Sequence, residues 1–240
     1  MAEGRAARRA IAPIAAAVSA AALGLLLAAG PGTRLGLWAF GRGFQMMRWA
    51  AYAGMAGVTL AVVALLLGPR RGLAVLALAL GLGAAVPPWQ VQRGASTKPP
   101  IHDITTDTAD PPPFVAIVPL RRDARNPAEY GGPEIAAQQR KAYPDVAPLL
   151  LPAPPAQVFE RAERAARGQG WEVVAAVPAE GRIEATDTTR WFGFKDDVVI
   201  RIRPEGAGSR VDVRSVSRIG RGDVGANARR IREFLEALRG

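Results

Sequence analysis

The sequence predicts an α+β protein: an N-terminal bundle of three transmembrane helices plus a soluble α-β-β-β-β-α domain with a four-stranded antiparallel sheet. Two observations predict this class. Long apolar stretches dominate residues 1–90, whereas residues 151–240 hold alternating strand patterns enclosed by two amphipathic helical patterns. The segment between them is rich in proline. We therefore divide the chain into a membrane region (1–90), a proline-rich extended segment (91–150) and an α+β domain (151–240).

Three apolar stretches, at about 11–29, 49–68 and 72–88, approach the ~20 residues that cross a hydrocarbon core. Backbone amides in lipid must be bonded within the segment, so each stretch is expected to be a helix. Small residues in such helices let neighbours approach closely, although glycine is also simply common there. The candidates for close packing are Gly24, Gly54, Gly57, Gly81 and Gly83.

The first stretch is either a cleaved signal peptide or an uncleaved anchor. Arginines precede an apolar run, as in a signal peptide. However, Ala28-Ala29-Gly30 is followed by Pro31, which disfavours cleavage. We therefore predict an uncleaved anchor.

Basic residues in short loops set the orientation of a membrane protein. Five lie on one side (Arg5, Arg8, Arg9, Arg70, Arg71) and five on the other (Arg34, Arg42, Arg48, Arg93, Lys98). The basic N-tail breaks this tie, because the first helix usually dominates, and it places the N-terminus inside. With three spans the sequence thus predicts a multi-pass membrane protein whose C-terminal domain lies outside; in a Gram-negative cell this means the bacterial inner membrane and a periplasmic domain.

The charge distribution favours a lipid membrane as partner and argues against nucleic acid. Residues 1–89 carry eight basic residues and one acidic residue, whereas residues 90–240 carry 23 basic and 20 acidic residues. The excess thus lies around the apolar stretches, and the soluble part lacks the strong basic balance of a nucleic-acid-binding face. The absence of cysteine excludes disulfides, thiolate catalysis and cysteine-based zinc sites. We expect no cofactor and no bound metal.

Residues 87–155 contain 15 of the 20 prolines, so an extended, irregular wrap with one helical turn near 136–142 is expected. A helix should then run from Pro154 to Gly168. Alternating apolar residues predict strands near 171–175, 183–185, 198–202 and 211–213, and a final helix over 224–238. The two helices should cover one face of the sheet. The other face should be either wet or covered by the proline-rich wrap.

Three strings in the soluble region are distinctive. They are PPIHDITTD (99–107), WFGFKDD (191–197) and RSVSRIG followed by GDVGAN (214–220 and 222–227). Together they resemble the bacterial family called domain of unknown function 1499, and the likeness covers roughly residues 99–238. The resemblance implies no catalytic residues that could be transferred to this chain.

Polar residues gather where the predicted strands share one end of the sheet. Antiparallel strands alternate in direction, so the end of the second strand, the start of the third and the end of the fourth meet. Buried polar groups there must satisfy one another or serve a ligand, because an unbonded one costs ~1–3 kcal/mol. The ligand-binding candidates are Asp187, Arg190, Trp191, Asp196, Asp197, Arg214, Ser215, Ser217, Arg218, Asp223 and Asn227.

Three interpretations of this polar end stay open. It is a structural network of Asp–Arg pairs, an anion or polar-headgroup site, or a catalytic site. Strict alternation places Arg214 on the opposite face from Ser215, so Arg214 joins the cluster only if a bulge near Ser215 re-aims the strand.

Gly220 to Gly225 satisfies G-x-G-x-x-G after a strand and before a helix. Only 15 residues follow, too few for the second parallel strand of a dinucleotide-binding fold. We interpret these glycines as turn residues, with Asp223 as the N-cap of the last helix.

A second candidate cluster combines the only histidine, His102, with Asp103 and Asp107. These side chains would suit a carboxylate-rich metal site or an acid–base pair. The simpler interpretation is that Asp and Thr beside prolines cap turns.

The function predicted from the sequence is a membrane-anchored extracytoplasmic domain, a non-enzymatic binding or envelope-assembly module. Its expected partner is an anionic envelope component or a partner protein. The alternative is a cell-envelope hydrolase or transferase that uses His102 and acidic residues. Such an enzyme would need an acid and a base that converge on one reachable reacting atom.

Overall fold

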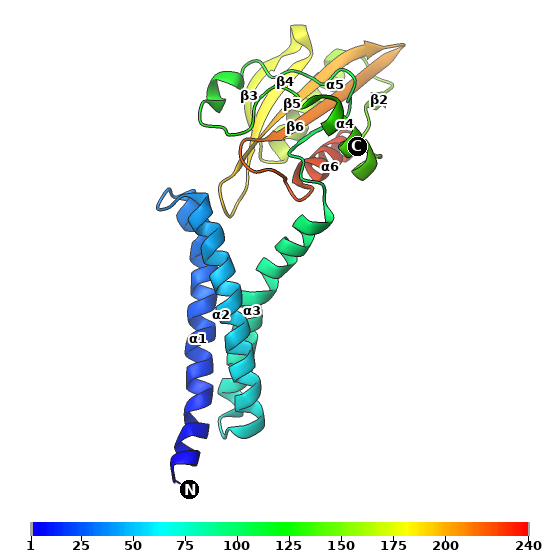
Figure 1. The fold of residues 1–240 in the computed structure, drawn as a ribbon. Helices are drawn as coiled ribbons and strands as arrows, with labels where there is room; N and C mark the ends of the chain where they lie inside the picture. Colours follow the sequence, from blue (N-terminus) through cyan, green and yellow to red (C-terminus); the bar gives the residue numbers. More distant parts are fainter. Residues whose placement is uncertain (1, 240) are drawn as a thin grey trace. The chain divides into compact units, whose positions relative to one another are not determined.

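The computed structural model describes residues 2–239, with side chains from residue 5 onward. The chain forms two compact units (Figure 1). The first comprises the residues up to 94 together with 190–193, and the second comprises 95–189 and the residues from 194 on. The first unit contains the apolar helices, and the second contains the sheet with its shorter helices.

The first unit contains three helices, α1 (Ala2–Arg34), α2 (Phe40–Leu67) and α3 (Arg71–Thr97). All three are long and apolar enough to cross a membrane. They extend beyond the predicted spans, most clearly in α3, where Pro87 and Pro88 lie inside the helix instead of ending it. Apolar helices of this kind tolerate proline, because neighbouring groups satisfy the backbone carbonyls that lose a donor.

Small residues form the contact seam of the three-helix bundle. The buried positions repeat at alternating spacings of three and four, the periodicity of a coiled-coil seam. In α1 they are Ala12, Ala15, Ser19, Ala22, Leu26 and Ala29; in α2 Met47, Ala50, Gly54, Gly57, Ala61 and Ala64; in α3 Ala74, Ala77, Gly81, Ala84 and Pro88. Each helix contributes one alanine to the layers Ala12–Ala64–Ala74 and Ala15–Ala61–Ala77.

The glycines of this bundle fall into two groups. A Cβ atom on Gly54 would lie 2.8 Å from the carbonyl oxygen of Gly81, and one on Gly57 would lie 2.3 Å from the Ser19 hydroxyl oxygen. Backbones therefore touch at Gly54, Gly57 and Gly81, as close packing requires. Gly24 has nothing within 4 Å, and Gly83 meets only Leu23 at 3.8 Å, so these two do not mediate close approach.

The second unit is built on one antiparallel sheet of six strands in the order β1-β6-β5-β4-β3, with β2 also paired to β6. The strands are β1 (Asp103–Thr105), β2 (Leu149–Leu151), β3 (Glu172–Val177), β4 (Arg182–Thr188), β5 (Lys195–Glu205) and β6 (Gly208–Ser217). The predicted meander is present as β3 to β6, but the predicted number of four strands is wrong. Two three-residue strands from the proline-rich segment pair with the otherwise open edge of β6.

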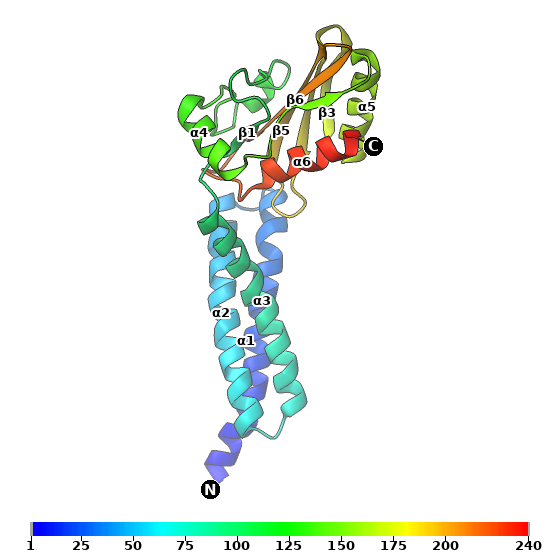
Figure 2. The same cartoon turned by 90° about the vertical axis from the view of Figure 1, so that its right-hand side faces the viewer.

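One face of the sheet packs against two helices, α5 (Pro155–Gly168) and α6 (Ala226–Arg239) (Figure 2). Their apolar stripes meet the inward residues of β4 to β6 in the main core. Within this core, Trp171 stacks on Phe234 with the ring centroids 5.3 Å apart. A further helix, α4 (Gly132–Ala142), contains the helical turn predicted near 136–142.

The other face of the sheet is covered by the proline-rich segment, which was one of the two alternatives for this face. Phe114 and Ile117 of that segment form a small apolar cluster with Val199 of β5 and Val216 of β6. Two short 3₁₀ helices, η1 (Val118–Arg121) and η2 (Pro178–Glu180), complete the described elements. The sheet therefore has a helix side and a wrap side, and polar residues become buried on both.

Candidate functional site

Strand register places three of the candidate residues in one row across the sheet. Asp187 of β4 pairs with Asp196 of β5, and Asp196 pairs with Ser217 of β6. All three point to the helix side, because each is two or four positions from a core residue of its own strand. The polar end inferred from strand direction therefore exists on this face.

Arg230 of α6 connects these residues into what we call the helix-side network: Asp187, Asp196, Ser215, Ser217, Asn227 and Arg230. Its Nε lies 2.8 Å from Asp187 Oδ2 and its Nη2 lies 2.7 Å from Asp196 Oδ2. Its Nη1 donates to Asn227 Oδ1 at 2.6 Å and to Ser215 Oγ at 3.1 Å. The guanidinium is thus bonded at all three nitrogens and is 7% exposed.

Asn227 closes the helix-side network. Its Oδ1 accepts from Ser215 Oγ at 2.7 Å, and its Nδ2 donates to Ser217 Oγ at 2.9 Å and to the His102 carbonyl at 3.0 Å. Burial raises the pKa of Asp196, although the neighbouring Arg230 charge opposes this shift. Every polar group of the network has a partner, as buried polar groups require.

Sequence reasoning missed Arg230, which is the centre of the network. It lies among Arg229, Ile231 and Arg232, and a run of arginines on a helix usually marks a solvated face. A helical-wheel argument would have found it, because position 230 follows Asn227 by three and precedes Phe234 by four. Arg230 thus falls on the buried stripe of α6.

Asp197 belongs to a separate network on the wrap side. Its carboxylate accepts from Arg218 Nε at 2.9 Å and Nη2 at 2.8 Å, and it also pairs with Arg121. Thr186 Oγ1 donates to the same carboxylate at 2.8 Å. Asp196 and Asp197 are adjacent in one strand and therefore point to opposite faces. The single contiguous cluster predicted from the sequence is wrong for this reason, although both halves lie at the same end of the sheet.

Arg214 also lies on the wrap side. The register between β5 and β6 runs without interruption past Ser215, so the bulge that would bring Arg214 to the helix side is absent. The guanidinium pairs with Asp103 at 2.8–2.9 Å and donates to the Ala128 carbonyl at 2.8 Å. Its Cζ lies 5.1 Å from the centroid of the Phe114 ring and 5.4 Å from the centroid of the Tyr130 ring. Burial and the Asp103 charge raise the pKa of Tyr130 to about 12, so its phenol stays neutral.

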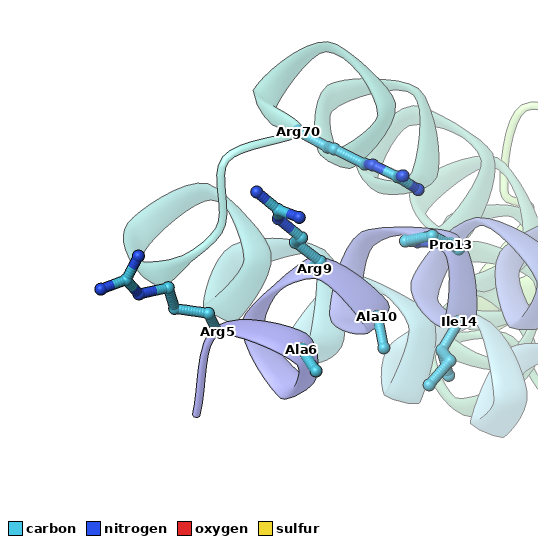
Figure 3. Close-up of a pocket in the computed structure, with 7 residues that line it drawn as sticks. All are labelled: Arg5, Ala6, Arg9, Ala10, Pro13, Ile14 and Arg70. Carbon is cyan, nitrogen blue, oxygen red and sulfur yellow. The ribbon is translucent and has the colours of Figure 1, made fainter. Parts of the chain in front are cut away.

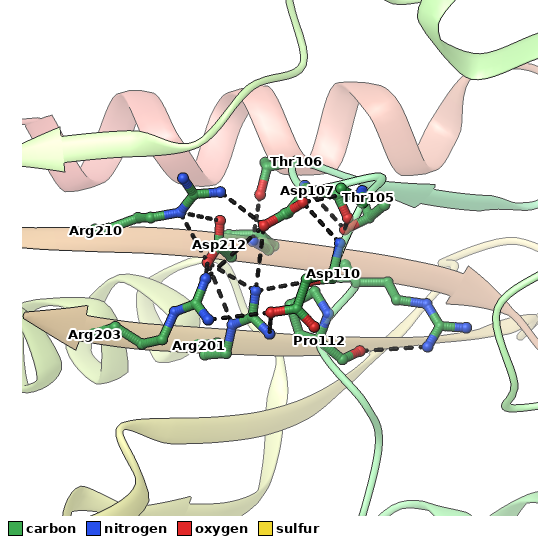
Figure 4. A network of polar contacts seen from close by, with 12 residues as sticks. Thr105, Thr106, Asp107, Asp110, Pro112, Arg201, Arg203, Arg210 and Asp212 are labelled. Atoms are coloured by element: carbon green, nitrogen blue, oxygen red, sulfur yellow. Dashed lines mark hydrogen bonds and ion pairs between the residues drawn. The ribbon is translucent and has the colours of Figure 1, made fainter. Parts of the chain in front are cut away.

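Two further buried carboxylates hold the wrap against the sheet. Glu184 accepts the backbone N–H groups of Val115, Ala116 and Ile117 at 2.9–3.1 Å. Asp212 is surrounded by the arginines of β5 and β6, which also reach Asp107 and Asp110 (Figure 4). These contacts attach the proline-rich segment to the sheet, because donors within the chain bind each carboxylate.

The second candidate cluster does not converge on a common point. His102 Nδ1 lies 3.4 Å from the Arg221 carbonyl oxygen, whereas Asp103 is held by Arg214. Asp107 accepts the N–H groups of Ala109 and Asp110 and pairs with Arg210 at 2.7 Å. Burial alone would raise the pKa of Asp107, but these hydrogen bonds and charges hold it below its usual value. Across residues 2–239, no group of three or more His, Asp or Glu side chains is placed to hold a metal ion.

The remaining candidates have other positions. Asp223 accepts the N–H groups of Gly225 at 2.8 Å and Asn227 at 2.7 Å, and so caps the start of α6. Arg190 and Trp191 fall in the first compact unit and do not take part in either network. The glycines near Asp223 serve the turn, with Gly220 and Gly225 at positive φ.

A polar pocket of about 270 Å³ opens beside the helix-side network. It is lined by Gln169, Trp171, Asp187, Ala226, Arg229, Arg230 and Glu233. The side chain of Asp187 is 29% exposed there, and Arg229 and Glu233 stand at the rim as a loose pair 3.9 Å apart. The pocket therefore offers solvent-facing charges of both signs.

A family model described as Protein of unknown function (DUF1499) matches residues 103–238. The chain belongs to this family. The DUF1499 match begins at Asp103 and ends within α6, so it spans the whole sheet, both networks and the residues that line the pocket. No curated protein matches the chain.

Proposed function

We propose that this protein is a membrane-anchored, non-enzymatic binding module, with its α+β domain on the periplasmic side of a bacterial inner membrane. The observation that supports a binding role is the polar pocket beside the helix-side network. Polar groups from β4, α6 and the α5–β3 connection meet at this pocket. Concave sites with a few convergent polar groups are the usual places for ligands.

The carboxylates at the polar end favour binding over catalysis. Asp196 and Asp197 are buried and ion-paired with arginine, and their remaining bonds go to hydroxyl groups. A general acid or base must reach the proton that it transfers in a bound substrate. These two carboxylates face the interior of the networks. Their ion pairs hold the sheet against α6 on one face and against the proline-rich segment on the other.

The charges at the pocket rim suggest the chemistry of the ligand. Arg230 is saturated by its partners, and the N–H groups at the start of α6 are capped by Asp223. Arg229 is left as the exposed cation of the pocket wall, beside Glu233 and the partly exposed carboxylate of Asp187. A guanidinium recognises a carboxylate, and two carboxylates suit an ammonium group. The complementary ligand carries both groups, as a short peptide of the cell envelope with free ends does.

Replacing Arg229 tests this ligand class. Dipeptides such as glycylglycine and alanylalanine are titrated calorimetrically into the full chain in detergent, with acetate and ethylamine as probes of one charge each. We expect the dipeptides to bind more tightly than either probe, and Arg229→Gln to weaken them by about tenfold, since it removes one charge-assisted contact.

The matched control for this titration is Arg164→Gln. Arg164 is as exposed as Arg229 and has the same loose i,i+4 pairing, at 3.8 Å from Glu160, but it lies on α5 away from the pocket lining. Equal loss in both variants, or no dipeptide binding at all, would contradict the proposal.

The orientation is tested independently of the ligand. A reporter that is active only outside the cytoplasm, fused after residue 240, is expected to be active, because the basic N-tail favours the inside. A reporter that is active only in the cytoplasm, fused at the same position, serves as the opposite control. Activity from the cytoplasmic reporter alone would reverse the orientation.

A further inference from the structure

A cluster of arginines lies at one end of the three-helix bundle. Arg5, Arg8 and Arg9 belong to the start of α1, and Arg70 and Arg71 lie at the turn into α3. The two segments are in contact, because a Cβ on Gly68 of this turn would lie 3.3 Å from the Arg8 carbonyl oxygen. All five arginines are exposed, and none has an ion-pair partner among the described side chains.

An open hollow of about 910 Å³ is lined by residues of both segments (Figure 3). Three of its lining residues are cationic: Arg5, Arg9 and Arg70. The others are Ala6, Ala10, Pro13 and Ile14. Figure 3 shows the side chain of Arg9 extending toward the turn that carries Arg70. The hollow thus has a basic rim at the end of the bundle and an apolar wall along α1.

Orientation signals alone explain why arginines occur at this end, but not why they border a common hollow. Cations brought together repel one another, and an anion between them removes that repulsion. Guanidinium groups match the oxygens of a phosphate with paired hydrogen bonds. The shared chemistry of a ligand for this rim is therefore a phosphate group.

The apolar wall decides between a free phosphate and a lipid. From Arg9 toward the middle of α1, the hollow continues along Ala10, Pro13 and Ile14, which lie at the start of an apolar span. Ile14 is 52% exposed and faces away from the seam of the bundle, where acyl chains lie in a membrane. A free phosphate has no apolar part that could contact this wall, whereas a phospholipid has acyl chains that can.

We propose that this hollow binds one anionic phospholipid, with the headgroup phosphate between Arg5, Arg9 and Arg70. The part of an acyl chain nearest the headgroup would lie against Pro13 and Ile14. Basic pockets at the ends of membrane helices bind anionic headgroups in this way. The proposal is independent of the ligand of the α+β domain, because it rests only on residues of α1 and the α2–α3 turn.

The test measures lipid retention by the full chain in detergent, using native mass spectrometry with phosphatidylglycerol and, separately, phosphatidylcholine. The wild-type chain is expected to retain phosphatidylglycerol preferentially. Arg9→Gln with Arg70→Gln should weaken that retention by on the order of tenfold, because two guanidinium contacts are lost. Arg9→Lys with Arg70→Lys keeps the charge but loses the paired geometry. Its retention of phosphatidylglycerol should lie between that of the wild type and that of the double glutamine variant.

The matched control is Arg42→Gln with Arg48→Gln, which removes the same charge from exposed positions near the start of α2. It should retain phosphatidylglycerol like the wild type. Equal loss in both glutamine variants would show a diffuse charge effect and overturn the site. Displacement of phosphatidylglycerol by inorganic phosphate, or equal retention of both lipids by the wild type, would overturn the lipid assignment. Unchanged melting temperatures establish that the variants remain folded.

Discussion

Replacing Arg230 with methionine is expected to lower the unfolding free energy of the α+β domain by about 3–5 kcal/mol, because the change leaves buried carboxylates without their cation. Asp196 is 4% exposed, and Arg230 is its only ion-pair partner within hydrogen-bond distance among the described residues. Urea titration of the full chain in detergent, read by pulse proteolysis, measures the change. Methionine preserves most of the side-chain volume, so the effect reports charge and hydrogen bonding.

The neighbouring variant Arg229→Met is the control for this prediction. Arg229 is largely exposed and makes only a loose pair, so its loss should change stability by less than about 1 kcal/mol. Arg230→Met should also become pH-dependent. With the pKa of Asp196 raised by burial and Arg230 gone, its stability should be greater at low pH and fall as pH rises through that raised pKa. Indistinguishable stabilities for the two methionine variants would contradict a structural role of the helix-side network.

Replacing Gly54 with leucine is expected to separate α2 from α3. The added Cβ alone would lie 2.8 Å from the Gly81 carbonyl oxygen and 3.0 Å from the Ala84 Cβ, and backbone cannot move aside as a flexible side chain can. Overpacking of this kind costs ~1–3 kcal/mol or more. The chain has no cysteine, so Ala61→Cys with Ala77→Cys, placed in one layer of the seam, reports helix contact through disulfide formation.

Gly54→Leu should sharply reduce this cross-link, whereas Gly24→Leu should leave it intact, because a Cβ on Gly24 meets nothing within 4 Å. Both changes add the same side chain to an apolar helix, so lipid partitioning is matched. Cross-linking that proceeds equally in the two variants would show that close backbone contact at Gly54 is not what holds the bundle together.

Hydrophobic periodicity was sufficient to predict the three apolar helices, α5, α6 and the strands β3 to β6. It was insufficient for β1 and β2, since three residues are too few to display alternation and their pairing depends on the edge that β6 leaves open. The glycine candidates divided in the same way. Sequence identified five, but only the rotation of each helix determines that Gly54 faces a neighbour and Gly24 does not.

The polar end shows where a strand-direction argument succeeds and where it stops. Direction correctly predicts that Asp187 and Ser217 lie at one end, because the meander fixes which strand ends coincide. Applied strictly, alternation also separates Asp196 from Asp197, so strand direction alone does not make one cluster of them. The helical wheel places Arg230 on the buried stripe of α6, but the role of Glu184 could not be predicted, because it depends on backbone N–H groups of a segment distant in the chain.

The pairing of both β1 and β2 with β6 has a consequence for the order of folding. Asp103 and Arg214 are 111 positions apart in the chain, yet they form one of its buried ion pairs. During synthesis, the segment that carries β1 emerges long before its only partner strand, and the meander can form without it. We therefore expect two kinetic steps: local hairpins closing first, followed by a slower capture of residues 101–151 that carries the high contact order of this topology. In the interval between these steps the edge of β6 is open to pairing with another strand, and the docking of β1 and β2 then covers that edge.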